Sequence, residues 1–144
     1  MKVQTTARIL RAISDDKSMH LFRLIFQNDG IDSGSLRSRS KLTRKQYYSR
    51  LSNMTNCGIV RRRKGGYGLT ALGKIVYNSQ MTVDKALTHF WKLKAIDSLK
   101  ISNELSKEEQ QKLVDALLDN PELRKIIEKR DEEMQESSAR QQQK

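Results

Sequence analysis

The sequence predicts a mainly helical protein with one short β-hairpin and a strongly basic first half. Its 144 residues include seven glycines and a single proline, and 31% of them are charged. This composition favours helices over sheets. Apolar residues recur at the three- and four-residue spacing of amphipathic helices along most of the chain. The length fits one domain with an appendage.

Three helices are expected before residue 43. The first spans about residues 4–13 and the second about 15–27, and Ser14-Asp15-Asp16 between them offers an N-cap for the second. The second segment is apolar nearly all round, which is typical of a central buried helix. A short serine-rich helix over 33–40, followed by a turn at Lys41-Leu42, would join the next helix tightly. This order is the helix-turn-helix arrangement.

A basic helix is predicted over about residues 43–57. Thr43 and Gln46 have the spacing of a capping box, and Gly58 supplies the left-handed residue that ends a helix at low cost. One face is apolar and is expected to be buried: Tyr47, Leu51 and Met54. The open face carries basic and small polar residues: Arg44, Lys45, Tyr48, Ser49 and Ser52.

A basic hairpin is predicted over residues 59–69. Its first strand carries the run from Arg61 to Lys64, and Gly65-Gly66 allows a tight reversal. Thr70 can then cap the next helix. Gly73 inside that helix costs about 1 kcal/mol relative to alanine, which indicates a close approach to neighbouring backbone.

The last third of the chain changes character. A second helix, or a continuation of the one before it, is expected from Val83 to about Leu99, with an apolar stripe from which Trp91 is displaced. Two further capped helices follow. Beyond residue 131 the only apolar anchor is Met134, which predicts disorder. The expected division is a basic domain over residues 1–80, a helical dimerisation or interaction region over 81–131, and a disordered tail over 132–144.

The charge of the chain is segregated along its length. The net charge is +11. Residues 1–80 hold 16 Lys and Arg against 4 Asp and Glu, whereas residues 81–144 hold 12 against 13. No acidic residue occurs from Ser33 to Val83. A solvated surface usually mixes both signs, so this window predicts a polyanionic partner.

Three stretches together resemble the winged helix-turn-helix domain of prokaryotic transcriptional regulators of the ArsR and MarR type. The middle stretch is most similar in character to small archaeal winged-helix proteins. They are AISDD at 12–16 with the apolar helix after it, LTRKQYYSRLSNMTNCGIV at 42–60, and YGLTALGKIVY at 67–77. The resemblance covers about residues 5–80. It implies a mainly α fold in which a two-stranded hairpin forms the wing and C-terminal helices dimerise.

The resemblance also implies a function: sequence-specific binding of double-stranded DNA by a homodimeric transcriptional regulator. The recognition helix, about residues 43–57, would enter the major groove, and the wing at 59–69 would lie on the backbone or in the minor groove. The residues expected to contact DNA are Arg37, Arg39, Lys41, Thr43, Arg44, Lys45, Tyr48, Ser49, Ser52, Arg61, Arg62, Arg63 and Lys64. Those expected to dimerise are Val83, Leu87, Phe90 and Leu93.

Other classes of function are weaker interpretations. The sequence contains no phosphate-cradling loop, zinc spacing or nucleophile motif, so no catalytic residue, metal or cofactor is expected. The ArsR-type metal sensors carry paired cysteines or His/Asp clusters, whereas this chain has Cys57, His20 and His89. An RNA binder is less favoured because stacking aromatics are sparse on the basic face. The main alternative is a winged-helix module for protein contacts or basal transcription that binds DNA with weak specificity.

The sequence also sets expectations for location. One cysteine excludes an internal disulfide, and no apolar run is long enough to span a membrane. We therefore expect a cytoplasmic, nucleoid-associated protein without membrane contacts. The sequence leaves the operator, the sign of regulation and any small-molecule effector open.

Overall fold

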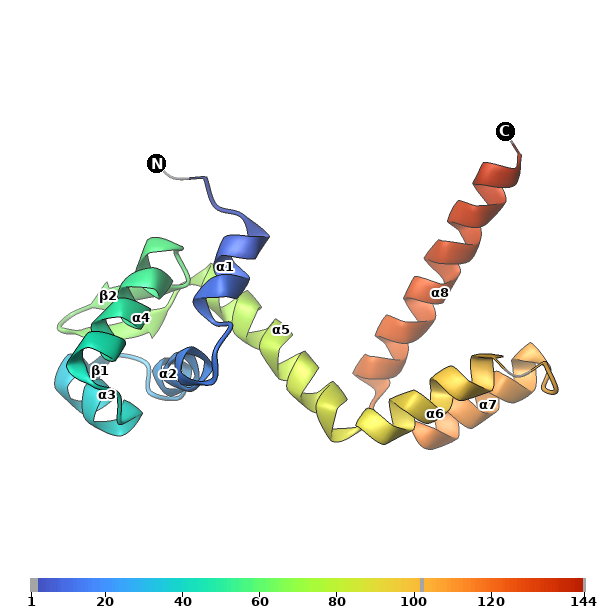
Figure 1. The fold of residues 1–144 in the computed structure, drawn as a ribbon, viewed down its shortest axis with the longest axis horizontal. Coiled ribbons are helices and arrows are strands. Elements are labelled where there is room, and N and C mark those ends of the chain that lie inside the picture. The colour runs from blue at the N-terminus through green and yellow to red at the C-terminus, as the bar shows by residue number, and fades with distance from the viewer. Residues whose placement is uncertain (1–2, 102, 144) are drawn as a thin grey trace. The chain divides into compact units, whose positions relative to one another are not determined.

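The computed structural model describes residues 3–101 and 103–143, which are mainly helical with a small antiparallel sheet (Figure 1). In chain order the elements are α1 (Thr6–Ala12), α2 (Asp16–Gln27), β1 (Ile31–Asp32), α3 (Ser33–Ser40), α4 (Arg44–Asn56), β2 (Val60–Arg63), β3 (Gly66–Leu69), α5 (Ala71–Thr88), α6 (Phe90–Ile101), α7 (Lys107–Leu117) and α8 (Pro121–Gln142). The chain divides into two compact units, and the boundary between them falls between Met81 and Thr82 within α5. None of the helices in the described ranges is long and apolar enough to cross a membrane.

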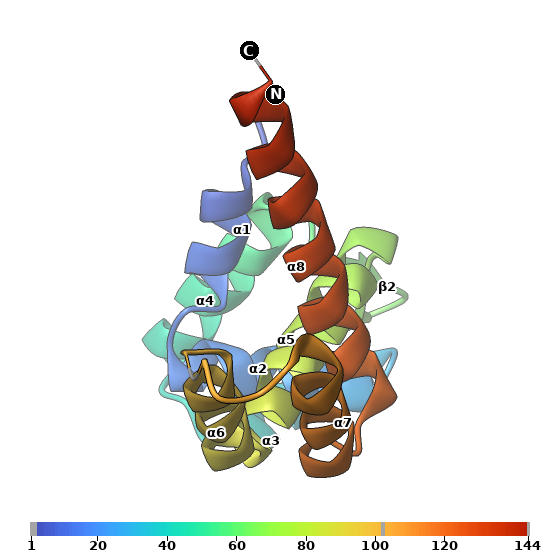
Figure 2. The ribbon, with the colours of Figure 1, turned by 90° about the vertical axis from the view of Figure 1, so that its right-hand side faces the viewer.

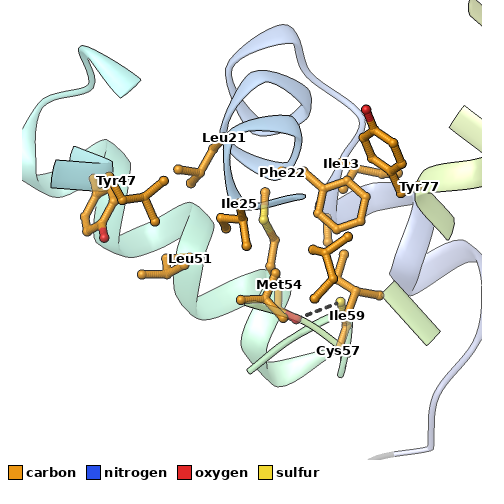
Figure 3. Packing of buried hydrophobic residues seen from close by; sticks show 14 residues of the cluster. Ile13, Leu21, Phe22, Ile25, Tyr47, Leu51, Met54, Cys57, Ile59 and Tyr77 are labelled. Atoms are coloured by element: carbon orange, nitrogen blue, oxygen red, sulfur yellow. Dashed lines mark hydrogen bonds between the residues drawn. The ribbon is translucent and has the colours of Figure 1, made fainter. Parts of the chain in front are cut away.

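The first unit is built around one face of α2, which is amphipathic and not buried all round as predicted, since Phe26 is 45% exposed. Side chains from α2, α3, α4, the sheet and α5 form one buried cluster (Figure 3). Its largest fully buried members are Leu21, Phe22, Ile25, Leu36, Tyr47, Met54 and Ile59. At one border of this cluster the Tyr77 ring stacks on Phe26, with ring centroids 3.9 Å apart, and meets Phe22 edge-on. The amphipathic patterns of α2 and α4 therefore converge on a single core.

The sheet has three strands, so the predicted two-stranded hairpin was incomplete. The strand order is β1-β3-β2, with both pairings antiparallel. β1 contributes only two residues, in which Ile31 pairs with Tyr67 and Asp32 with Gly66. A two-residue strand leaves no alternating pattern in the sequence, and it forms because β3 offers a second edge.

The hairpin reverses at Lys64-Gly65, one residue earlier than the predicted Gly65-Gly66. Lys64 has φ 41° and Gly65 has φ 82°, so both turn residues are left-handed, as a two-residue hairpin turn requires. Gly66 lies within β3, where a Cβ atom would collide with the carbonyl oxygens of Gly30 and Ile31. The glycine pair thus serves two purposes: Gly65 turns the chain and Gly66 admits β1.

The start of α5 depends on Thr70 and Gly73. The Gly73 N–H donates to Thr70 Oγ1 over 3.0 Å, and the Thr70 hydroxyl donates to the Gly58 carbonyl over 2.6 Å. A Cβ on Gly73 would collide with the Ile59 carbonyl oxygen. The close backbone approach predicted at Gly73 is confirmed.

In the second unit α6 and α7 lie side by side (Figure 2). Four buried side chains form its core: Ile96, Val114, Leu118 and Leu123. The Glu122 carboxylate, at the start of α8, accepts hydrogen bonds from Lys85 over 3.3 Å and Thr82 over 3.1 Å. These bonds, that of Lys85 first, lower the pKa of Glu122. They tie the first turn of α8 to the end of α5.

The predicted helix over Val83–Leu99 is interrupted at His89. α5 ends at Thr88 and α6 begins at Phe90, and the His89 N–H donates to the Ala86 carbonyl. The break shifts the helical phase, so Leu93 is half-buried against the core of the second unit instead of lying in an open stripe. The predicted role of Leu93 in dimerisation stays a prediction, although the residue is less exposed than Val83, Leu87 and Phe90.

Four apolar side chains around the break are exposed, and they define what we call the open apolar surface. Their exposed fractions are 59% for Val83, 62% for Leu87, 43% for Phe90 and 76% for Trp91. The first three were predicted as dimerisation residues.

The segment over 132–144, predicted to be disordered, is helical as far as Gln142 in α8. Its Glu, Gln, Ala and Arg residues have high helix propensity, and its described side chains are exposed. The structure therefore differs from the predicted disorder, because a segment of good helix formers can continue α8 without an apolar anchor of its own.

Candidate nucleic-acid interface

The basic helix α4 is fixed at both ends by its own sequence. Thr43 and Gln46 form the predicted capping box: the Gln46 N–H donates to Thr43 Oγ1 over 3.2 Å, and the Thr43 N–H donates to Gln46 Oε1 over 3.3 Å. At the other end the Cys57 N–H donates to the Asn53 carbonyl, and Gly58 is left-handed at φ 83°. These caps set which residues stand in the first turn.

Tyr47 anchors the inner face of α4. Its side chain is fully buried, and its hydroxyl lies 3.0 Å from Ser33 Oγ and 3.3 Å from the Ser33 carbonyl, to which it donates. Burial raises the pKa of the Tyr47 phenol, so the hydroxyl stays protonated and able to donate. Tyr47 therefore packs in the core, as its helical phase predicted, and also ties α4 to the start of α3.

The outer face of α4 presents its basic and small polar residues to solvent. Arg44, Lys45, Tyr48, Ser49 and Ser52 are all exposed. The Arg44 guanidinium lies over the Tyr48 ring, 5.9 Å from its centroid, a cation–π arrangement that restricts the arginine. Among the side chains that the structure describes, no carboxylate pairs with Arg44 or Lys45.

Arg50 on the same helix has a different role. It is half-buried, and its Nε donates to the Asp15 carboxylate over 3.3 Å. Burial alone would raise the pKa of Asp15, but hydrogen bonds from Ser18 and the Arg50 guanidinium outweigh it and lower that pKa. Asp15 is one of only four acidic residues before residue 81, so few carboxylates could pair with Arg50, and this scarcity is the signal that the sequence contains. Arg50 thus connects α4 to the start of α2.

The helix α3 contributes a second row of cations. Arg37, Arg39 and Lys41 are exposed, and Arg39 donates to Asn28 Oδ1 over 2.9 Å. Asp32 caps this helix by accepting from the Ser35 N–H over 2.9 Å. Hydrogen bonds from Ser35 lower the pKa of Asp32, so the cap is charged at neutral pH. The carboxylate thus stabilises a helix whose serines make it marginal alone.

The hairpin places four cations around one open hollow. The hollow has a volume of about 510 Å³ and is lined by Asp29, Gly30, Arg61, Arg62, Arg63 and Lys64. Arg62 lies 5.9 Å from the centroid of the Tyr67 ring, its cross-strand partner. Arg63 instead pairs with Asp29, with 3.2 Å between Nη1 and Oδ2. Asp29 and Tyr67 were absent from the predicted site, because only the strand pairing brings them to these arginines.

The elements of the candidate interface are packed against one another. α4 contacts both α3 and β2, and all the side chains predicted to bind DNA are exposed on these elements or on the adjoining turns. Comparison of the chain with protein-family models, with curated proteins and with solved structures gives no match.

The next feature is the placement of the side chains that could bind a metal ion. Within the part of the chain that the structure describes, no group of three or more His, Cys, Asp or Glu side chains is placed to hold a metal ion. Burial raises the pKa of the Cys57 thiol, and its Sγ donates to the Met54 carbonyl over 3.4 Å (Figure 3). Cys57 is therefore a packing residue in the protonated form.

Proposed function

We propose that this chain is a winged helix-turn-helix regulator that binds double-stranded DNA with sequence specificity as a homodimer. The observation that carries the proposal is the pairing of α4 with a basic hairpin. α4 exposes Arg44 and Lys45 in a first turn set by the capping box, and β2 exposes Arg61 and Arg62 beside it.

The proposal assigns α4 to the major groove and the hairpin to the backbone or minor groove. Arg44 and Lys45 would meet guanine acceptors or phosphates, and Tyr48, Ser49 and Ser52 would contact bases or sugars. Arg37, Arg39 and Lys41 would position the duplex through its phosphates. Arg61 to Lys64 would supply affinity that is nearly independent of sequence. The protein would then work in the cytoplasm, associated with the nucleoid.

Homodimerisation is the second part of the proposal. Val83, Leu87 and Phe90, together with Trp91, form the open apolar surface of the second unit. Two-fold operators favour dimeric proteins, and large exposed apolar side chains are typical of interfaces.

The test is selection of bound sequences from a random duplex pool, followed by affinity measurements at several salt concentrations. A palindromic motif is expected, with a log–log salt slope of about −4 to −7, which corresponds to about 4–8 phosphates per dimer. Arg62→Ala should weaken binding to all sequences alike. Arg44→Ala should weaken binding and also change the selected motif, by about 1–3 kcal/mol at the affected base pair.

Arg140→Ala is the matched control, because it removes one exposed arginine from α8, outside the candidate interface. Its motif and affinity should stay near those of the wild-type protein. A flat salt response contradicts the DNA proposal altogether. Equal affinity for every duplex favours the alternative of a weakly specific module.

A further inference from the structure

One face of the hairpin is built from arginines on one strand and glycines on the other. Arg61 and Arg63 lie two residues apart on β2 and so share a face, as successive strand residues alternate. Their cross-strand partners are Gly68 and Gly66. Neither glycine has a side chain to cover this face, so the space between the arginines and β3 is open to another group.

The Asp29 carboxylate occupies that space. A Cβ on Gly68 would collide with Asp29 Oδ1 and would lie 3.3 Å from Arg63 Cδ. Asp29 Oδ2 is 3.2 Å and Oδ1 is 3.5 Å from Arg63 Nη1, so both oxygens face the same guanidinium nitrogen. The acid thus fits into a notch that exists only because residue 68 is glycine.

The backbone on either side of Asp29 holds it in this place. The Gly30 N–H donates to the Tyr67 carbonyl over 3.0 Å, and Ile31 pairs with Tyr67 in the sheet. The carboxylate therefore comes from a segment 34 residues before Arg63, fixed to β3 by strand pairing. Its position does not depend on the ion pair alone.

The ion pair changes the charge of the hollow more than the stability of the fold. The side chains of Arg63 and Asp29 are 46% and 64% exposed, and exposed pairs contribute little to folding. Among the described residues that line the hollow, however, Asp29 is the only acid among four cations. It neutralises one of them and stands where a phosphate oxygen would approach.

We infer that Asp29 is a specificity-determining residue that competes with DNA phosphate for Arg63. This inference rests on the proposed DNA binding and extends it to a residue outside the basic window. In the free protein the carboxylate holds Arg63 and weakens the attraction of the hairpin for any duplex. Only a backbone that fits closely against the hairpin displaces the carboxylate, so the acid raises the ratio of specific to non-specific binding.

The test compares Asp29→Asn with the wild-type protein on a random-sequence duplex and on the selected duplex. Fluorescence anisotropy at several KCl concentrations gives the dissociation constants and the salt slopes. Asp29→Asn should tighten random-duplex binding by about two- to fivefold, the fold-change equivalent of one exposed ion pair. Its salt slope should steepen by about 0.9 for each protomer on the duplex, because each chain neutralises one more phosphate. Affinity for the selected duplex should change less.

Two further variants separate local competition from a change in net charge. Asp16→Asn makes the same change of charge at the opposite end of α2, about 16 Å of helix away from Gln27. It should alter the slope by much less. In an Arg63→Ala background, Asp29→Asn should have little effect, because the residue it restrains is gone.

The outcomes distinguish this inference from the proposed function. A wild-type protein that binds no duplex overturns both. A wild-type protein that binds with a steep salt slope, while Asp29→Asn behaves like Asp16→Asn or binds more weakly, overturns the role of Asp29 alone. Thermal unfolding of each variant, monitored by circular dichroism, confirms that the compared proteins are folded.

Discussion

At the scale of single residues, three glycines make room for neighbouring groups. Gly66 admits the backbone of β1, Gly68 admits the Asp29 carboxylate, and Gly73 admits the Ile59 carbonyl. In each case the missing Cβ lets two segments distant in the sequence meet. Substitution at these positions should therefore act through long-range contacts and not through local propensity.

Gly73→Ala should lower the stability of the first unit. In an unconstrained helix this change would stabilise the protein by about 1 kcal/mol. Here the added methyl collides with the Ile59 carbonyl oxygen, which also accepts the Thr70 N–H over 3.1 Å. We expect the free energy of unfolding to fall by about 1–3 kcal/mol, as in other overpacked sites. Urea unfolding followed by circular dichroism measures this.

Ser79→Ala on the exposed side of the same helix provides the comparison. It should leave the unfolding midpoint nearly unchanged or raise it slightly. A Gly73→Ala protein more stable than the wild type would show that the contact with Ile59 relaxes at no cost.

At the scale of elements, the short helix α3 depends on its neighbours and on one charge. Its four serines and Gly34 give it low intrinsic helicity. Asp32 caps its start, and the Tyr47 hydroxyl contacts Ser33 from α4. Because α3 carries Arg37 and Arg39, whatever loosens it also moves the cations predicted to position the duplex.

The Asp32 cap predicts a loss of stability in acid. Hydrogen bonds from Ser35 lower the pKa of Asp32 in the folded state relative to an unfolded value of about 3.9. The stabilisation is therefore present above the unfolded pKa and is lost as the pH falls through the lower folded pKa. The urea midpoint of the wild-type protein should decrease between about pH 5 and pH 3.

Asp32→Asn keeps an N-cap acceptor but removes the titrating group. Its midpoint should fall less over the same range, although it starts lower at pH 7 because the charge at the helix N-terminus is gone. Identical pH profiles for the two proteins would contradict an ionised cap.

At the scale of the whole molecule, the excess positive charge and the open apolar surface lie in different units. Residues 1–80 carry a net charge of +12, from 16 basic and 4 acidic residues, whereas residues 81–144 carry −1. The open apolar surface at Val83, Leu87, Phe90 and Trp91 belongs to the second unit. This separation suits a protein in which one unit contacts a polyanion and the other contacts a second chain.

The open apolar surface predicts self-association. Sedimentation velocity at tens of micromolar should give a species of twice the 16.7-kDa chain mass. Leu87→Asp should shift this species to the monomer, because each copy would bury a charge against an apolar neighbour. The first unit should unfold at the same urea concentration in both proteins.

Met134→Asp is the control, since it places a charge on an exposed apolar residue of α8 outside the proposed interface. It should remain dimeric. A wild-type protein that is monomeric at tens of micromolar contradicts the dimer and leaves the proposed DNA binding by the first unit as a separate question.

Local signals in the sequence predicted most of the first unit. The Thr43–Gln46 capping box and the left-handed Gly58 bound α4 correctly, because caps depend on residues within one turn. Features made by long-range pairing were not predictable in this way. β1 exists only through its register with Tyr67, and the Asp29–Arg63 pair follows from that register.

In the second unit the sequence predicted where helices occur, but not which of their side chains face the core. A continuous stripe from Val83 onward assumed one unbroken helix, and with the break at His89 Leu93 lies half-buried against the core of the second unit. In the basic window, side-chain types identified the candidate interface, but only the structure separates Arg50, which is tied to Asp15, from Arg44, which is open to solvent.

Two lysines of the candidate interface, Lys41 and Lys64, adopt left-handed backbone conformations at φ 55° and φ 41°. Such conformations cost an ordinary side chain about 1–2 kcal/mol, which glycine avoids. Selection for thermal stability alone would therefore favour glycine at both positions. Selection for affinity toward an anionic partner would retain lysine. A library varied at residues 41 and 64 should therefore yield glycine when it is sorted for thermal stability and lysine when it is sorted for affinity. The natural lysines would then indicate that affinity has shaped this surface.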